Sequence, residues 1–136
     1  MNFKKGADAL NNCIHYIFKR QVERTPEAIA LFSPSLEKFT YRQLDQHANR
    51  LANYLRERGV GPETIVGICM ERSPEMVAAL LGIMKAGGAY LPLDPAFPSE
   101  RLAFMVEDSG ARFLLVEDRT KGKIPEGKQQ IGRAHV

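Results

Sequence analysis

The chain has 136 residues, which is enough for one compact domain with a substantial apolar core but not for two independent domains. The composition, with 44% hydrophobic and 26% charged residues, is typical of a globular protein. The absence of a long apolar run argues against a membrane-spanning helix and a signal-peptide core, so a cytoplasmic location is expected. The formal net charge is +3, but the excess of Lys and Arg lies in residues 120–136, and the balanced remainder argues against nucleic-acid binding.

Apolar residues first recur at helical spacing in residues 13–24, at Ile14, Ile17, Phe18 and Val22. This spacing predicts a helix that ends at Thr25-Pro26. The apolar run 28–32 then predicts a strand, and Pro34 turns the chain toward a shorter strand at 38–40. The two strands together predict a hairpin.

A capping-box pattern follows the hairpin, because Thr40 is succeeded three residues later by Gln43. It predicts a helix that begins after Thr40 and stops at Gly59, where a left-handed residue can end the last turn. The face of this helix that we expect to be buried carries Leu44, Ala48, Leu51, Ala52 and Leu55.

From residue 65 onward the chain alternates between apolar strands and helices. Strands are predicted at 65–70, 89–93 and 112–116. One helix begins at Ser73-Pro74 and ends at Gly87-Gly88, and a second is capped by Ser99, carries Leu102, Phe104 and Met105, and stops at Gly110. Apolar strands joined by helices predict a parallel sheet covered on both faces, which is a doubly wound α/β fold.

Residues after Glu117 are rich in Lys, Gly, Pro and Gln and hold few apolar side chains. We therefore predict a disordered tail at 119–136, after a domain that covers 13–118 and a short N-terminal extension at 1–12.

Three residues follow the carboxyl ends of predicted strands, where open α/β sheets tend to bind ligands: Arg72, Ser73 and Asp94. Arg72 and Ser73 are the best local candidates for a ligand contact, although Ser73 is first of all an N-cap. Asp94 stands beside Pro95, and an Asp in such a place is more often a turn residue than a ligand contact.

Other reactive residue types favour structural roles. Gly87-Gly88 follows a helix instead of preceding one, so a helix cap and turn are expected there and not a phosphate loop. Lys85, in the last turn of the same helix, is favoured there by the helix dipole. The two cysteines, Cys13 and Cys69, form no Cys-x-x-Cys pair, and the three histidines do not share metal-ligand spacing, so neither a disulfide framework nor a zinc site is indicated.

Two stretches resemble the first conserved blocks of adenylation domains in nonribosomal peptide synthetases. Residues 39–44, FTYRQL, resemble the block Leu-(Thr/Ser)-Tyr-x-Glu-Leu. Residues 84–94, MKAGGAYLPLD, match the block Leu-Lys-Ala-Gly-x-Ala-Tyr-(Leu/Val)-Pro-(Leu/Ile)-Asp at every position but the first. Supporting similarity extends over residues 13–116. The replacements at Phe39, Gln43 and Met84 preserve polarity or capping ability, so they leave the resemblance intact.

The resemblance implies an enzyme that uses ATP and magnesium to form an aminoacyl adenylate, and then loads the amino acid on the phosphopantetheine thiol of a carrier protein. Carrier-protein and condensation domains are the implied partners in the parent synthetase. Such chemistry needs a phosphate-gripping loop and a positioned cation, and the sequence contains neither. We therefore assign no catalytic, cofactor-binding or metal-binding residue, and expect the chain alone to be inactive and to bind no cofactor.

Two alternatives to this interpretation stay open. The chain resembles, less closely, an acyl-CoA synthetase or another adenylate-forming ligase, and a noncatalytic α/β interaction module belongs to a different class of function. Because the family's later segments pack against this region, we also expect the isolated chain to expose sheet edges and apolar faces and to aggregate or fold only partly.

The end of the chain departs from the family. Residues 131–136, read back as ATC GGA AGA GCA CAC GTC, resemble the start of a common sequencing-library adapter, and the next adapter triplet is a stop. We hypothesise that the reading frame was truncated by adapter sequence after Gln130, which resequencing of the source DNA tests.

Overall fold

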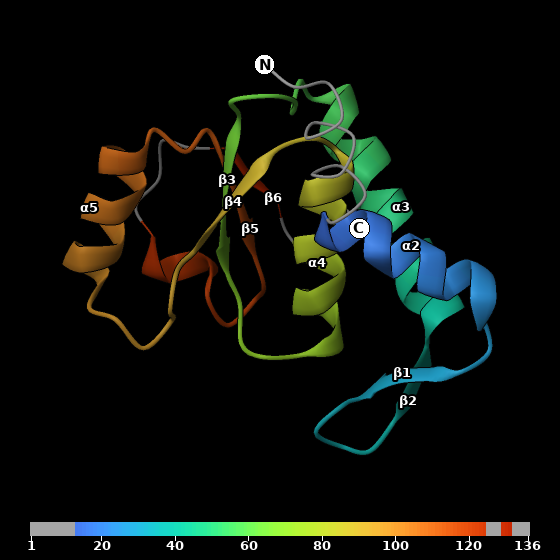
Figure 1. Ribbon diagram of the computed structural model, residues 1–136. Coiled ribbons are helices and arrows are strands. Elements are labelled where there is room, and N and C mark those ends of the chain that lie inside the picture. The colour runs from blue at the N-terminus through green and yellow to red at the C-terminus, as the bar shows by residue number, and fades with distance from the viewer. Residues whose placement is uncertain (1–12, 125–128, 132–136) are drawn as a thin grey trace.

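The computed structural model describes residues 13–124 and 129–131 (Figure 1). Its helices and strands, in chain order, are α2 (Ile14–Arg24), β1 (Ile29–Phe32), β2 (Lys38–Thr40), α3 (Tyr41–Glu57), β3 (Ile65–Cys69), α4 (Pro74–Lys85), β4 (Ala89–Pro92), α5 (Ser99–Ser109), β5 (Phe113–Val116), the short 3-10 helix η1 (Lys121–Lys123) and β6 (Gln129–Ile131). Among the described helices, none is both long and apolar enough to cross a lipid bilayer.

The main sheet has four parallel strands in the order β4-β3-β5-β6. Val66 of β3 pairs with Tyr90 of β4 on one side and with Phe113 of β5 on the other. The connection from β3 to β4 passes through α4, and the connection from β4 back across β3 to β5 passes through α5. These two helices lie on opposite sides of the sheet (Figure 1). The predicted doubly wound α/β fold is therefore confirmed.

Each face of the sheet has its own apolar core, because successive side chains of a strand point to opposite faces. The core beneath α3 and α4 includes Leu51, Leu55, Val66, Ile68, Ile83, Phe113, Leu115 and Ile131. The core beneath α5 includes Cys69, Leu93, Leu102, Val106, Leu114, Val116 and Ile124. All five residues expected on the buried face of α3 are buried.

Most of the predicted helix boundaries are confirmed. The Thr40 hydroxyl accepts from the Gln43 N–H at 3.1 Å, and Gln43 Oε1 accepts from the Thr40 N–H at 2.8 Å, which completes the capping box. Gly59 and Gly110 end their helices with φ of 97° and 74°. The expected cap at Ser99 is wrong, because Ser99 is already helical and the N-cap is Pro98, whose side chain makes no capping hydrogen bond.

Within the segment 119–136, for which the sequence predicts disorder, the structure describes residues 119–124 and 129–131 and gives them contacts with the core. The Thr120 side chain is 1% exposed, and its hydroxyl donates to the Cys69 carbonyl oxygen at 2.5 Å. Ile124 packs into the core beneath α5, and Ile131 of β6 packs into the opposite core. The prediction of disorder rests on the average composition of the segment. An average does not show that single residues of a polar segment, here Thr120, Ile124 and Ile131, can be buried in the core. The predictions for 125–128 and 132–136 lie outside the described residues.

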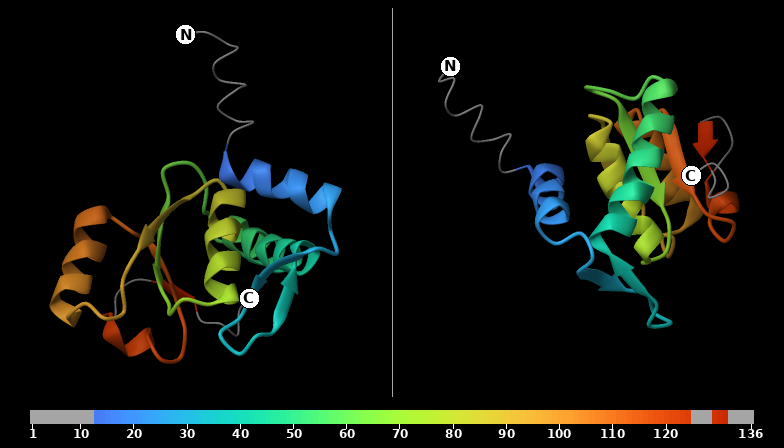
Figure 2. Two further views of the ribbon diagram at one scale, coloured as in Figure 1. Left: turned by 60° about the horizontal axis from the view of Figure 1, so that its bottom comes forward. Right: turned by 90° about the vertical axis from the view of Figure 1, so that its right-hand side faces the viewer.

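Helix α2 and the β1-β2 hairpin lie at the periphery, beside α3 and α4 (Figure 2). The hairpin is antiparallel, as predicted. None of the eleven α2 residues is buried, and Ile14 and Ile17, which were predicted to share an apolar face, are 61% and 47% exposed. The apolar face of α2 is thus only partly covered by the described residues.

Phe104 of α5 is also largely exposed, whereas Leu102 and Val106 are buried.

Candidate functional site

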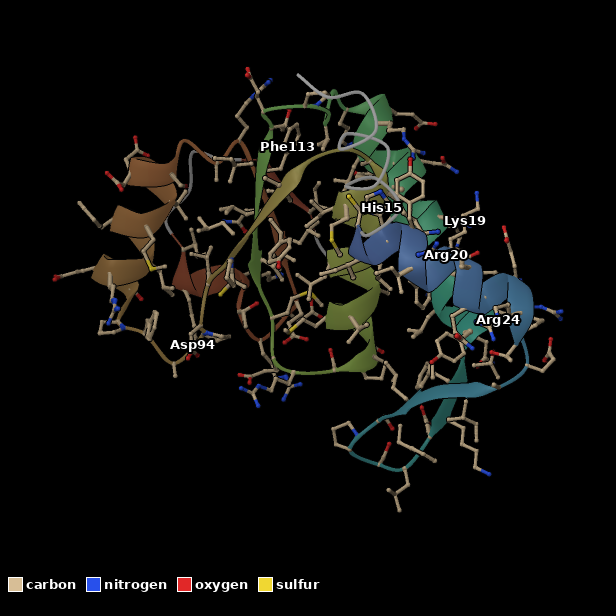
Figure 3. All side chains as sticks on the ribbon, in the orientation of Figure 1. His15, Lys19, Arg20, Arg24, Asp94 and Phe113 are labelled. Carbon is tan, nitrogen blue, oxygen red and sulfur yellow. The ribbon has the colours of Figure 1, made fainter. Side chains whose placement is uncertain are left out.

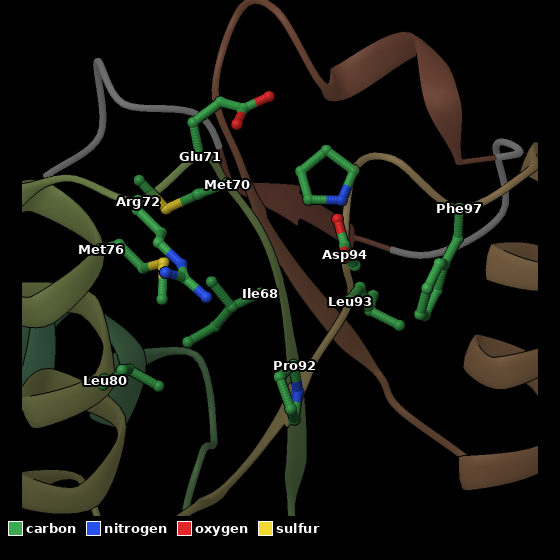
Figure 4. A pocket seen from close by; sticks show the side chains of 11 residues that line it. Ile68, Met70, Glu71, Arg72, Met76, Leu80, Pro92, Leu93, Asp94 and Phe97 are labelled. Carbon is green, nitrogen blue, oxygen red and sulfur yellow. The ribbon is translucent and has the colours of Figure 1, made fainter.

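A hollow of about 590 Å³ opens where β3 and β4 end and α4 begins. Its floor is apolar, and three charged side chains, Glu71, Arg72 and Asp94, stand at its rim (Figure 4). The apolar lining consists of Ile68, Met70, Met76, Leu80, Pro92, Leu93, Pro95 and Phe97.

The position of the hollow follows from the sheet topology. After β3 the chain turns to α4 on one face, and after the neighbouring strand β4 it turns to α5 on the opposite face. Two adjacent strands whose continuations separate leave a crevice outside their carboxyl ends, and this is where open α/β sheets bind ligands. The structure therefore brings the sequence candidates Arg72 and Asp94 to one crevice.

Ser73 serves mainly as a helix cap. Its hydroxyl accepts from the Met76 N–H at 3.1 Å and lies 3.2 Å from the Glu71 carbonyl oxygen, to which it donates. Arg72, immediately before it, is exposed and lines both the main hollow and a smaller one of about 370 Å³ beside the hairpin. Of this pair, only Arg72 presents a charge to the main hollow.

Asp94 forms the predicted turn. Its side-chain oxygen accepts from the Ala96 N–H at 2.9 Å, and its carbonyl oxygen accepts from the Phe97 N–H at 3.0 Å. These bonds hold the loop that carries Phe97 against the hollow. The second Asp94 carboxylate oxygen has no hydrogen-bond partner among the described residues, so the rim retains a polar acceptor there.

Sequence reasoning missed the contacts that fix the β3 end of this edge. The Glu117 carboxylate, which follows β5, accepts from the Glu71 N–H at 2.7 Å. Thr120 bonds the Cys69 carbonyl oxygen from the same loop. The signal in the sequence was the presence of polar residues just after each of these two strands. Because β3 and β5 are adjacent and parallel, the residues that follow them lie at the same edge of the sheet and can bond to one another.

Lys85 and Gly87-Gly88 lie at the opposite end of α4 from the hollow, and their predicted structural roles agree with their contacts. The Lys85 ammonium forms an ion pair with Asp45 and donates to Asn49 Oδ1 at 2.7 Å, which joins α4 to α3. Gly87 has φ of 87°, and Gly88 lies against Val60 and Thr64. These glycines follow the end of a helix, as a cap and turn require.

The described residues offer little other reactive chemistry. Burial raises the pKa of the Cys69 thiol, which makes a reactive thiolate unfavourable. Burial, and then the nearby Arg50, lower the pKa of His47, so its imidazole is neutral near pH 7. Among the described residues, no group of three or more His, Cys, Asp or Glu side chains could hold a metal ion.

The residues that line the hollow do not by themselves supply the groups that bind a nucleotide triphosphate. A triphosphate needs backbone amides at a helix N-terminus or in a glycine-rich loop, with a cation beside them. At the rim, Arg72 is the single cation among the described lining residues, and Glu71 and Asp94 oppose it. The arrangement supplies an apolar wall with a charged rim, which is one side of a crevice.

A doubly wound sheet with a crevice outside its strand ends defines an α/β ligand-binding domain. Within this class, residues 18–135 match the profile of the family described as AMP-binding enzyme, so the chain belongs to the AMP-binding enzyme family.

The curated relatives narrow this assignment. The chain is 50% identical over 119 residues to a linear gramicidin synthase of Brevibacillus parabrevis, and 48% identical over 129 residues to bacitracin synthase 3 of Bacillus licheniformis. These alignments cover 88% and 95% of the chain but 2% of each relative. The chain is thus similar to a small part of each of these large synthases.

Solved structures agree. The nonribosomal peptide synthetase FmoA3 is 41% identical with a TM-score of 0.82, over 87% of this chain and 13% of that one. The N-terminal subdomain of Klebsiella oxytoca NpsA is 29% identical with a TM-score of 0.81, over 90% of this chain and 31% of that one. The resemblance noted in the sequence is confirmed: the chain corresponds to the N-terminal AMP-binding region of peptide synthetase adenylation domains.

Proposed function

We propose that this chain is the N-terminal part of a domain that uses ATP and Mg²⁺ to convert an amino acid to its aminoacyl adenylate, and that passes the amino acid to a carrier-protein phosphopantetheine thiol. The observation that carries the proposal is the identity of about half of all aligned residues to gramicidin and bacitracin synthases over most of the chain. FmoA3, 41% identical, also has an AMPPNP-bound form, which supports ATP as the nucleotide.

The role of the chain itself is to form one wall of the crevice. Adenylate formation requires the carboxylate to be held in line with the α-phosphate while charge is stabilised. The described residues hold the β3 and β4 ends in place through Glu117, Thr120 and Asp94, but they offer no phosphate-gripping loop. The chain alone is therefore expected to be inactive, and the catalytic groups belong to later segments of the parent domain.

The parent protein is proposed to work in the cytoplasm with carrier-protein and condensation domains as partners. The artificial fusion of NpsA with a carrier domain, 28% identical to this chain, supports the carrier partner. An acyl-CoA synthetase parent has weaker support, because the gramicidin and bacitracin synthases, which share about half of the aligned residues with this chain, are peptide synthases.

Amino-acid-dependent exchange of radiolabelled pyrophosphate into ATP tests the proposal. The coding sequence is extended in frame to a complete adenylation domain, and each of the common amino acids is assayed singly. One amino acid, or a few related ones, should support exchange well above the amino-acid-free control. Exchange that depends on a fatty acid and on no amino acid would contradict the proposal and identify another adenylate-forming ligase.

A further inference from the structure

Another hollow, of about 210 Å³, lies where α2, α3 and α4 meet, away from the β3 and β4 ends. Figure 3 labels His15 and Lys19 on the α2 side of this region. The residues that line it are His15, Tyr16, Lys19, Asn49, Arg56 and Lys85, and we refer to it as the α2–α4 basic pocket.

Positive charge is in excess in this pocket. Lys19, Arg56 and Lys85 supply three cations from three different helices. Asp45, which is ion-paired with Lys85, is the single carboxylate with a salt bridge to these cations among the described residues. One counter-charge for three cations leaves the pocket attractive to an anion.

Several N–H donors of these cations remain available. An ammonium has three donors, and Lys85 uses two of them on Asp45 and Asn49. A guanidinium has five, and Arg56 uses one on the Lys85 carbonyl oxygen and one on a side chain of its own helix. The Lys19 ammonium has no hydrogen-bond or ion-pair partner among the residues that the structure describes. The pocket can therefore donate from three sides.

Part of the pocket is fixed before any ligand arrives. The Lys85 and Asp45 side chains are only 11% and 20% exposed, and the bond from Arg56 to the Lys85 carbonyl oxygen ties α3 to the end of α4. Donors already held by the fold lose less conformational entropy when a ligand binds. This distinguishes the pocket from a scatter of surface lysines.

His15 lies close enough to these cations for its pKa to respond to their charge. Its pKa is lowered first by burial and then by the positive charge of Lys85. The ring is thus neutral near pH 7, and Lys19, Arg56 and Lys85 are the charged groups that line the pocket with it. An anion bound among these groups would oppose the effect of Lys85 and raise the pKa of His15.

We propose that the α2–α4 basic pocket binds a phosphate group, either as a free ion or as a phosphate ester. A tetrahedral oxyanion accepts hydrogen bonds from several directions at once, and Arg and Lys are the side chains that bind phosphate most readily. The pocket is separate from the crevice at the β3 and β4 ends, so the proposal stands or falls independently of amino-acid activation.

Titration with inorganic phosphate tests the proposal. The His15 ring-proton NMR signal is followed in the complete chain at constant ionic strength, and saturable binding together with a rise in the His15 pKa is expected. Lys19→Gln should weaken binding roughly tenfold, as expected for the loss of a charge-assisted hydrogen bond. Arg24→Gln is the matched control, because it removes the same charge from an exposed position of the same helix outside the pocket. It should leave binding nearly unchanged.

Glycerol phosphate and acetate are titrated in the same way to define the class of anion. If glycerol phosphate binds as tightly as inorganic phosphate, the pocket accepts an esterified phosphate group. If inorganic phosphate binds and glycerol phosphate does not, the ligand is a free ion. Binding that does not saturate, an equal loss in both variants, or acetate binding as tight as phosphate would overturn the proposal. Where the free chain self-associates, the same titration is carried out on the chain fused to a highly soluble protein tag, so that the test still gives a decisive result.

Discussion

Gly88 illustrates how one residue of the MKAGGAYLPLD motif acts through packing. A Cβ atom built on Gly88 lies 2.9 Å from Val60 Cγ1 and 3.2 Å from the Thr64 carbonyl oxygen. Val60 is buried, so its side chain has little room to move away. Gly88→Ala should therefore lower the free energy of unfolding by about 1–3 kcal/mol, which is typical of overpacking in a core. Urea denaturation followed by circular dichroism measures the change.

The neighbouring Gly61 provides the control for this prediction. A Cβ atom at Gly61 meets nothing within 4 Å, and its φ is not in the left-handed region. Gly61→Ala should be neutral, or stabilise by up to about 1 kcal/mol through the unfolded chain. Equal destabilisation by both substitutions would show that the close approach at Gly88 is not the reason that glycine stands there.

At the scale of the elements, the loop after β5 and strand β6 depend on Thr120. Its buried hydroxyl donates to the Cys69 carbonyl oxygen and accepts from the Glu117 N–H at 3.1 Å. Thr120→Val keeps the shape but leaves both backbone groups without this partner, so unfolding should become easier by about 1–3 kcal/mol. Thr25→Val, at an exposed helix end, is the comparison and should change stability by no more than about 0.5 kcal/mol. Similar midpoints for the two variants in urea would contradict the packing of residues 119–124.

The elements that sequence predicted are those set by local chemistry. The Thr40–Gln43 capping box, the Ser73 cap and the glycine stops involve residues at most a few positions apart. Ile65–Cys69 and Phe113–Val116 were recognised because strands buried on both faces are apolar throughout. The Asp94 turn was also local, and so one side of the hollow was foreseen.

The features that sequence reasoning missed depend on residues far apart in the chain. The bond from the Glu71 N–H to Glu117 spans 46 positions, and the bond from Thr120 to the Cys69 carbonyl oxygen spans 51. For β6, the composition of the segment predicts disorder. The structure instead pairs this strand with β5, and such pairing supplies stability that no local pattern reveals. Pairing between adjacent parallel strands is the information that was absent.

At the scale of the whole molecule, large apolar side chains remain uncovered. Ile14, Ile17, Phe32 and Leu36 are between 47% and 77% exposed, and they lie on α2 and around the hairpin. The chain spans only 31% of the NpsA N-terminal subdomain and 2% of the curated relatives named above, so in a longer parent these faces have material to pack against. The uncovered faces favour association of isolated chains.

Light scattering and binding of an apolar dye measure this exposure. The isolated chain should bind the dye and associate with rising concentration, and Ile17→Lys should reduce dye binding at little cost in stability because Ile17 is half-exposed. A monodisperse monomer that melts cooperatively and binds no dye would contradict this description of the isolated chain.

The affinity of the 136-residue chain for ATP, measured by equilibrium dialysis with Mg²⁺ present, tests the central claim most directly. The hollow at the β3 and β4 ends has an apolar floor and a rim in which Arg72 faces two carboxylates, so no saturable ATP binding at this edge is predicted. Binding of the ATP phosphates at the α2–α4 basic pocket is distinguished by measuring the Lys19→Gln variant alongside the unaltered chain, because that substitution should weaken binding at the pocket and leave the β3 and β4 ends unchanged. Saturable ATP binding that survives in that variant and is lost in Arg72→Gln would contradict the claim that this chain forms only one wall of the nucleotide crevice.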